Sequence, residues 1–141
     1  MLTRPEIEAR IPHAGAMCLL DRVLNFDPTR IVCQAAAPSK DHPLAEGPGV
    51  PAVAVVEYAA QAVALHGALL DDAVVSRRGV LAKVTGVELA PGWLDASSGT
   101  LTVEARLLAR DASACRYSFV VDDSQGCRGR GCLLIAFTGE G

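Results

Sequence analysis

One imidazole and one carboxyl group stand where acid and base chemistry is expected. His42 lies in residues 39–51, a segment with three prolines and two glycines, and Glu57 follows it by fifteen positions. Residues 52–70 surround Glu57 with mostly apolar side chains. Burial disfavours an ionised carboxyl group, so we expect Glu57 to hold a proton at neutral pH and act as a general acid. Neutral His42 would then be the general base.

Structural roles for both residues stay open at this point. A histidine in a loop is often a solvated or capping residue, and a carboxyl group in an apolar helix can serve packing through a polar partner. An acid and a base that face one substrate perform elimination or hydration. Pro51 marks the start of the apolar segment, so the amides of Ala52 and Val53 are expected to be unpaired donors that hold the enolate oxygen of a thioester.

The segment that carries Glu57 is expected to be a helix over residues 52–70. Nineteen helical residues span about 28 Å, and a helix that is apolar on all sides is either a membrane span or the buried axis of a fold. Glu57 near its middle, the pair Asp71-Asp72 after it, and the absence of flanking Lys or Arg favour the buried axis. We therefore expect no membrane span.

The chain on both sides of this helix has a period of two. Leu101, Val103 and Ala105 alternate with polar residues, which indicates a sheet with one solvated face. A single helix among antiparallel strands can be buried only against one curled sheet. The sequence predicts an α+β fold, as a single domain over residues 1–141, with strands at residues 19–26, 30–37, 77–89, 100–110, 113–121 and 128–137.

Composition excludes several classes of protein. Half of the residues are hydrophobic and 21% are charged, which excludes a disordered or collagen-like chain. A net charge of −3 offers no field that would attract nucleic acid. An odd number of cysteines, without a CxxC pair or an N-terminal signal segment, predicts a reduced, cytoplasmic protein without a metal site; they are Cys18, Cys33, Cys115, Cys127 and Cys132.

Several spaced motifs are similar to those of one family. The stretch IPHAGAMCLLDRV occupies residues 11–23, His42 is followed by proline, Pro51 precedes Glu57 by six positions, and Gln61 follows it by four. This pattern resembles the 3-hydroxyacyl-[acyl-carrier-protein] dehydratases of the hot-dog fold. It is most similar to the branch associated with aryl-polyene and related lipid pathways. The resemblance covers residues 11 to about 66.

The resemblance implies a dimer with each active site at the subunit interface. His42 of one chain would remove the α-proton of a (3R)-3-hydroxyacyl thioester, and Glu57 of the other would protonate the departing hydroxyl group. The product would be a trans-2-enoyl thioester, with no cofactor. Gln61 would orient Glu57, in keeping with their i, i+4 spacing. The implied partners are an acyl carrier protein and either a second copy or another hot-dog subunit.

Three positions depart from the family pattern. Fatty-acid members commonly have Gly before the histidine, an aromatic residue after it, and Gly at the helix start, where this chain has Asp41, Pro43 and Ala52. Alanine keeps the N–H group but not the freedom to adopt positive φ, so the oxyanion geometry depends on Ala52. Asp41 is either a solvated loop charge or a neighbour that raises the basicity of His42.

The remaining histidines and Tyr58 have secondary roles. His13 matches the N-terminal motif and is expected to position loops. His66 lies nine residues past Glu57, which at about 100° per residue places it on the opposite helix face, in a structural or interfacial role. Tyr58 either borders the acyl tunnel or packs in the core.

Two groups of basic residues are candidates for carrier-protein docking. Arg77, Arg78 and Lys83 form one, and Arg128 and Arg130 form the other, although either group would equally fit a solvated strand end. Two functions besides dehydration stay open. One is a hot-dog thioesterase in which Glu57 activates water, and the other is a non-catalytic partner subunit in a mixed dimer.

Overall fold

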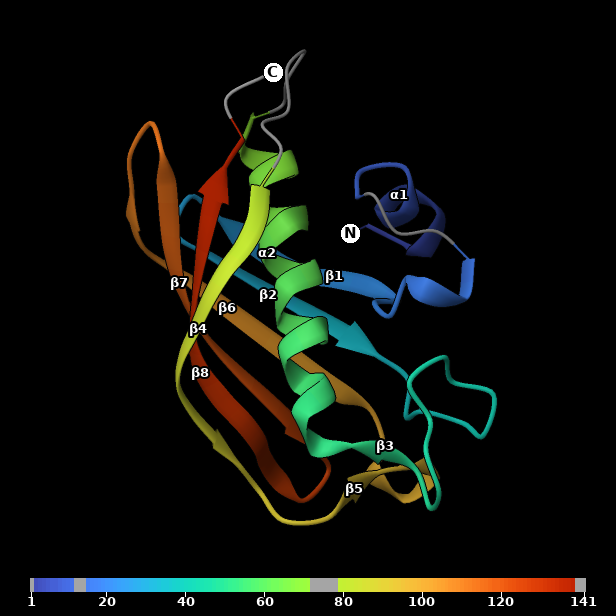
Figure 1. Cartoon of the computed structure of the whole chain (residues 1–141). Helices are drawn as coiled ribbons and strands as arrows, with labels where there is room; N and C mark the ends of the chain where they lie inside the picture. The colour runs from blue at the N-terminus through green and yellow to red at the C-terminus, as the bar shows by residue number, and fades with distance from the viewer. Residues whose placement is uncertain (1, 12–14, 72–78, 139–141) are drawn as a thin grey trace.

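The structure is a computed structural model that describes residues 2–11, 15–71 and 79–138. Its main sheet is antiparallel, with six strands in the order β1-β2-β6-β7-β8-β4 (Figure 1). The strands are β1 (Arg22–Asp27), β2 (Arg30–Ala35), β4 (Gly79–Leu89), β6 (Leu101–Arg110), β7 (Ala114–Asp123) and β8 (Gly126–Phe137). All six predicted strands are present. The first starts three residues later than expected, because Leu19 and Leu20 are buried ahead of the sheet.

The alternation predicted for residues 100–110 is confirmed in β6. Leu101, Val103 and Ala105 are fully buried, and the residues between them are partly exposed. The alternation ends at a register shift between Leu107 and Ala109 in the pairing of β6 with β7. One face of the sheet therefore meets the core and the other meets solvent, as the period of two indicates.

The long helix α2 (Val55–Asp71) lies across the sheet and packs against β2, β6, β7 and β8 (Figure 1). The α-helix begins three residues later than predicted. Pro51 belongs instead to the short strand β3 (Val50–Pro51), which pairs with β5 (Trp93–Leu94), and Ala52–Ala54 form a single 3₁₀ turn, η2. The predicted curled sheet around one central helix is confirmed.

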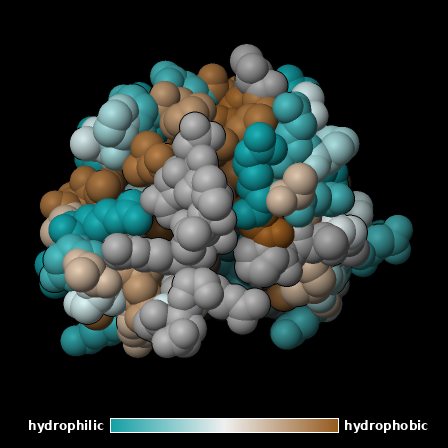
Figure 2. All heavy atoms as spheres, turned by 90° about the horizontal axis from the view of Figure 1, so that it is seen from above, coloured by the Kyte–Doolittle hydropathy of each residue, from teal (hydrophilic) through white to brown (hydrophobic). Residues whose placement is uncertain are grey.

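Residues Ala52–Leu70 are long and apolar enough to cross a membrane by length and composition, and half of the segment is buried inside the protein. A core helix meets the same two criteria, and α2 covers the sheet with its buried side chains. On the face seen from above, apolar and hydrophilic side chains are interspersed (Figure 2). These observations fit the expected role of α2 as the axis of the fold.

The start of α2 approaches β8 closely. A Cβ atom at Gly129 would lie 2.6 Å from Cγ2 of Val55 and 3.0 Å from Cδ2 of Leu89. Such distances are shorter than van der Waals contact, so a larger side chain would have to displace the side chains of Val55 and Leu89. Glycine at position 129 therefore lets the first residue of α2 pack directly on β8.

His66 is a buried polar contact of α2. Its Nε2 lies 2.7 Å from the backbone carbonyl of Asp27 and its Nδ1 lies 2.6 Å from the hydroxyl of Tyr117. A carbonyl can only accept, so Nε2 donates to Asp27 and Nδ1 accepts from Tyr117. Burial lowers the pKa of His66, which keeps the ring neutral. The structural role expected for His66 is confirmed.

One short helix and two 3₁₀ turns complete the fold. The short helix α1 (Arg4–Glu8) starts with a capping box between Thr3 and Glu6, and Thr3 also bridges to the start of β1. A 3₁₀ turn, η1 (Gly15–Met17), leads from this region to the buried residues before β1, and another, η3 (Ala96–Ser98), precedes β6. The first of these turns becomes important at the site.

Candidate active site

A tight turn after β2 holds His42. Its backbone N–H donates to the carbonyl of Ser39 at 3.1 Å, and its own carbonyl accepts from Ala45 at 3.0 Å. The amide of Leu44 donates to His42 Nδ1 at 3.1 Å. The prolines and glycines of this segment give the backbone a defined path, and these bonds fix the imidazole ring on it.

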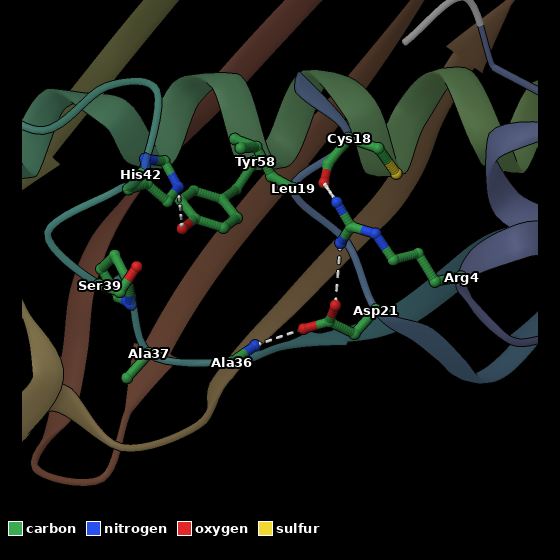
Figure 3. Close-up of a pocket in the computed structure, with 10 residues that line it drawn as sticks. Arg4, Cys18, Leu19, Asp21, Ala36, Ala37, Ser39, His42 and Tyr58 are labelled. Carbon is green, nitrogen blue, oxygen red and sulfur yellow. Dashed lines mark hydrogen bonds and ion pairs between the residues drawn. The ribbon is translucent and has the colours of Figure 1, made fainter. Parts of the chain in front are cut away.

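The second ring nitrogen of His42 contacts Tyr58. Nε2 lies 3.1 Å from the Tyr58 hydroxyl (Figure 3). Because the Leu44 amide can only donate, Nδ1 presents its lone pair, and the neutral ring carries its proton on Nε2. Nε2 therefore donates to the hydroxyl oxygen of Tyr58. Burial lowers the pKa of His42, so the neutral ring is the main form near pH 7.

Tyr58 packs in the core, as one of its two expected roles requires, and it also lines the cavity beside His42. A role of Tyr58 at an acyl tunnel stays a prediction. Burial, with the nearby charge of Asp21, raises the pKa of Tyr58 to about 12. The phenol is therefore neutral at physiological pH and both accepts and donates hydrogen bonds.

Glu57 and Gln61 form the hydrogen bond that their spacing predicts. Gln61 is fully buried, and its Nε2 donates to Glu57 Oε2 at 3.1 Å. The same nitrogen donates to the carbonyl of Met17 at 2.8 Å, and Gln61 Oε1 accepts from the amide of Leu19 at 2.9 Å. Glu57 itself is half-buried in the single chain, in the first turn of α2. It is less enclosed than the apolar sequence around it predicts.

A cavity of about 150 Å³ lies beside His42 (Figure 3). Tyr58 and Ser39 line it together with Arg4 and Asp21, whose side chains pair at 3.0 Å. Sequence reasoning did not identify Arg4 or Asp21 as site residues. Asp21 lies inside the motif at residues 11–23, but no sequence pattern indicates that Arg4 lies beside it.

The candidate oxyanion donors lie at the entrance to α2. Ala52 and Val53 belong to η2, where Val53 is 58% exposed and Ala52 is partly buried. This 3₁₀ turn directly precedes the helical turn that carries Glu57. The role of these two amides stays a prediction, as do the catalytic roles of His42 and Glu57.

The structure describes some of the candidate basic residues but not others. His13, Arg77 and Arg78 lie outside the described residues. Arg128 pairs with Asp123 at 3.4 Å and Arg130 with Glu88 at 3.3 Å, whereas Lys83 is exposed on β4. The two arginines are thus partly neutralised by carboxylates of the same chain. Over the described ranges, no three or more His, Cys, Asp or Glu side chains are grouped as metal ligands.

A family model and two known proteins match this chain in sequence, and all three are named as dehydratases. The family model described as ApeP-like, ApeP dehydratase, matches residues 5–135. A 3-hydroxyacyl-[acyl-carrier-protein] dehydratase FabZ from Ruminiclostridium cellulolyticum is 32% identical over 114 residues, which cover 77% of this chain and 78% of that protein. A FabZ from Acetivibrio thermocellus is 30% identical over 115 residues, covering 77% and 76%.

Solved structures share the fold. The dehydratase heterocomplex ApeI:P from Xenorhabdus doucetiae matches with a TM-score of 0.82 and 20% identity, over 95% of this chain and 91% of that one. A hypothetical thioesterase from Streptococcus pneumoniae TIGR4, solved with coenzyme A, matches with a TM-score of 0.64 and 13% identity, over 84% and 86%. With the family match over residues 5–135, the chain belongs to the ApeP-like dehydratases of the hot-dog fold.

Proposed function

We propose that this protein dehydrates (3R)-3-hydroxyacyl thioesters on an acyl carrier protein to trans-2-enoyl thioesters, for fatty-acid, aryl-polyene or related lipid synthesis. The observation that carries the proposal is the pair of adjacent residues in the first turn of α2. Glu57 is oriented by Gln61, and Tyr58 contacts His42. Each chain thereby carries one oriented acid and one held imidazole, which would serve two different sites shared with a second subunit.

The reaction removes water by two proton transfers. His42 of one subunit takes the α-proton, the electron pair forms the new double bond, and the C3–O bond breaks. Glu57 of the other subunit delivers its proton to the departing oxygen, which leaves as water. The amides of Ala52 and Val53 donate to the thioester oxygen while it carries negative charge.

His42 must change its ring tautomer to act as the base. In the single chain Nε2 carries the proton and Nδ1 accepts from Leu44, so neither nitrogen presents a free lone pair. Abstraction by Nε2 requires the proton to reside on Nδ1, and the Leu44 contact to open. We assign this rearrangement to assembly of the complete site between two subunits.

Gln61 prepares Glu57 for its role as the acid. Its NH₂ group donates to Oε2, and a carbonyl-type oxygen accepts better than a hydroxyl oxygen. The proton that Glu57 would deliver therefore belongs on Oε1. A fixed proton position saves the reorganisation that a freely rotating carboxyl group would need during the transfer.

The second subunit would associate with the exposed edge of the sheet. Strand β4 is an edge strand, and it exposes the apolar side chains Val80, Leu81, Val87 and Leu89. Exposed edges and apolar patches favour pairing with another chain. The ApeI:P structure is a heterocomplex, so a mixed dimer with another hot-dog subunit is as compatible with this surface as a homodimer.

We propose a cytoplasmic, single-domain enzyme without a cofactor. All five cysteines are free, and burial raises the pKa of the Cys33 thiol to about 12, so that it is inert. Free thiols fit a reducing compartment. An acyl carrier protein, which is acidic, would be attracted by exposed cations such as Lys83, and Arg130 contributes less because Glu88 pairs with it.

A thioester assay tests the proposed function. The purified protein, with its oligomeric state measured, is given 3-hydroxybutyryl and crotonyl thioesters of an acyl carrier protein. Reversible appearance of the absorbance of the conjugated enoyl thioester supports dehydration, whereas release of free thiol would identify a thioesterase. A loss below about tenfold in His42→Ala, in whichever dimer forms, would identify a non-catalytic partner subunit.

A further inference from the structure

We propose that Arg4 of helix α1 is a positioning residue for Glu57, acting through the backbone of residues 15–21 and the side chain of Gln61. The inference rests on the proposed role of Glu57 as the acid. It adds a residue from outside the helix and the His42 loop to the machinery of the reaction.

The guanidinium group of Arg4 closes residues 15–21 into one unit. Nη2 donates to the carbonyls of Gly15 at 2.8 Å and Cys18 at 2.5 Å. Nη1 lies 3.0 Å from Asp21 Oδ1 and 3.5 Å from the carbonyl of Leu20. A planar fork of donors can hold both ends of a turn at once, which a lysine ammonium cannot do with the same geometry.

Arg4 is itself held from the far side of this unit. Asp21 Oδ2 accepts from the amide of Ala36, the first residue after β2, at 2.6 Å. Figure 3 shows the resulting row from Ala36 through Asp21 to Arg4 and the Cys18–Leu19 backbone, along one side of the cavity. The segment is therefore tied to the sheet as well as to α1.

The backbone of residues 15–21 determines the orientation of the Gln61 side-chain amide. The amide of Leu19 can only donate and the carbonyl of Met17 can only accept, so Oε1 of Gln61 must face Leu19 and Nε2 must face Met17. This excludes the flipped amide, which would place an oxygen against Glu57. Gln61 Nε2 is therefore directed at Glu57 Oε2, and the contacts form an unbroken series from Arg4 to the acid.

The expected effect is on alignment rather than on global stability. The side chains of Arg4 and Asp21 are each 36% exposed, and ion pairs that are this exposed contribute little to the free energy of unfolding. Small displacements of a catalytic group are costly to the chemical step. We expect Arg4→Gln to lower kcat about tenfold, with KM changed less than about twofold.

Arg10→Gln is the matched control. Arg10 is exposed, follows the same helix, and donates to the carbonyl of Glu6 at 2.8 Å, outside residues 15–21. This variant should keep the wild-type kcat. Arg4→Lys keeps the charge but not the fork, so it should restore only part of the activity. Full activity in Arg4→Gln, or an equal loss in Arg10→Gln, overturns the inference.

A double-mutant cycle separates positioning from a general loss of stability. If Arg4 acts through Gln61, Arg4→Gln should cost less than about twofold in kcat once Gln61→Ala is present. If the two losses multiply, Arg4 does not act through Gln61 and the inference fails. The alkaline limb of the kcat–pH profile, where the general acid loses its proton, should shift in Arg4→Gln and stay in place in Arg10→Gln.

A measurement without substrate keeps the inference separate from the proposed function. Amide hydrogen exchange followed by NMR should show Leu19 losing protection by about tenfold in Arg4→Gln, while Val103 in the centre of the sheet keeps its protection. Unchanged protection of Leu19 overturns the role of Arg4 even if the enzyme is active. A wild-type protein without dehydratase activity overturns the proposed function instead. If Arg4→Gln does not fold, Asp21→Asn tests the same contact between Arg4 and Asp21.

Discussion

The position of a single proton decides what His42 can do. Its Nδ1 accepts from Leu44 and its Nε2 donates to Tyr58, so the ring in one subunit has no free lone pair. Glu57 differs, because Gln61 already directs a donor at its carboxyl group. Within one chain the proposed acid is therefore preorganised and the proposed base is not.

The tautomer of His42 can be measured directly. With the ring nitrogens labelled with ¹⁵N, we expect a neutral His42 in the isolated subunit to show the Nε2–H form above its pKa, which burial lowers below 6.5. Assembly of the active dimer should move population toward the Nδ1–H form. A proton on Nδ1 in the isolated subunit would contradict the hydrogen bonds described above.

Replacing the acid should remove catalysis without unfolding the protein. Glu57→Gln keeps the shape and the contact region of the side chain but cannot deliver a proton, so turnover should fall at least about 10²-fold. Glu104→Gln, on strand β6, serves as the control and should leave the rate unchanged. Steady-state rates and the thermal midpoint are compared for both variants. An unchanged rate in Glu57→Gln would contradict the assignment.

At the scale of elements, α2 joins the site to the sheet. Its first turn carries Glu57 and Tyr58, and its later turns are fixed through His66 to β1 and β7. The neutral ring fits this site, because Nδ1 accepts from Tyr117 while Nε2 donates to the carbonyl of Asp27. Protonation of the ring would place a charge among buried groups and would require the Tyr117 hydroxyl to change from donor to acceptor.

The stability of this helix contact should depend on pH. The pKa of His66 is lowered from 6.5 by burial, so the unfolded chain binds the proton more readily. The contribution of neutral His66 to the free energy of unfolding should then be fully present above about pH 6.5. It should decrease as the pH drops from there toward the folded-state pKa. His42, whose pKa is also lowered, contributes in the same direction.

Denaturation curves at several pH values test this dependence. In His66→Gln the decrease in stability between about pH 6.5 and 5 should be smaller than in the wild type, although the variant is less stable at neutral pH. His42→Gln is the comparison at the half-buried site, where a smaller change is expected. An identical pH dependence in His66→Gln and the wild type would contradict the role of the ring.

At the scale of the molecule, the proposed site needs two chains. The edge strand β4 exposes four apolar side chains, and the base and acid are assigned to opposite subunits. Loss of association should therefore abolish turnover even though each subunit keeps its fold.

Substitutions on β4 separate association from folding. Val80→Lys with Val87→Lys should weaken the dimer and reduce activity in parallel, because charges on a paired edge oppose strand addition. Leu108→Lys changes an exposed apolar residue on β6 and should leave association unchanged. Sedimentation and the thioester assay are run at matched concentrations. Full activity in a monomeric variant would contradict a site shared between subunits.

The sequence by itself determined the fold class and the candidate acid and base. A period of two and a long apolar run are local properties, so the six strands and the apolar helix were predictable, and an isolated carboxyl group in that helix made Glu57 the candidate acid. The spacing of Gln61 four residues later predicted their hydrogen bond. Helix and strand ends were less accurate, because the pairing of Pro51 with Trp93 delays the start of α2.

Only the tertiary structure decided the contacts that join distant segments. Leu19 meets Gln61 across 42 positions, Arg4 meets Asp21 across 17, and His42 meets Tyr58 across 16. No local pattern encodes these contacts, because they depend on how α1, the segment before β1 and α2 pack against one sheet. The orientation of Gln61 and the tautomer of His42 follow from that packing.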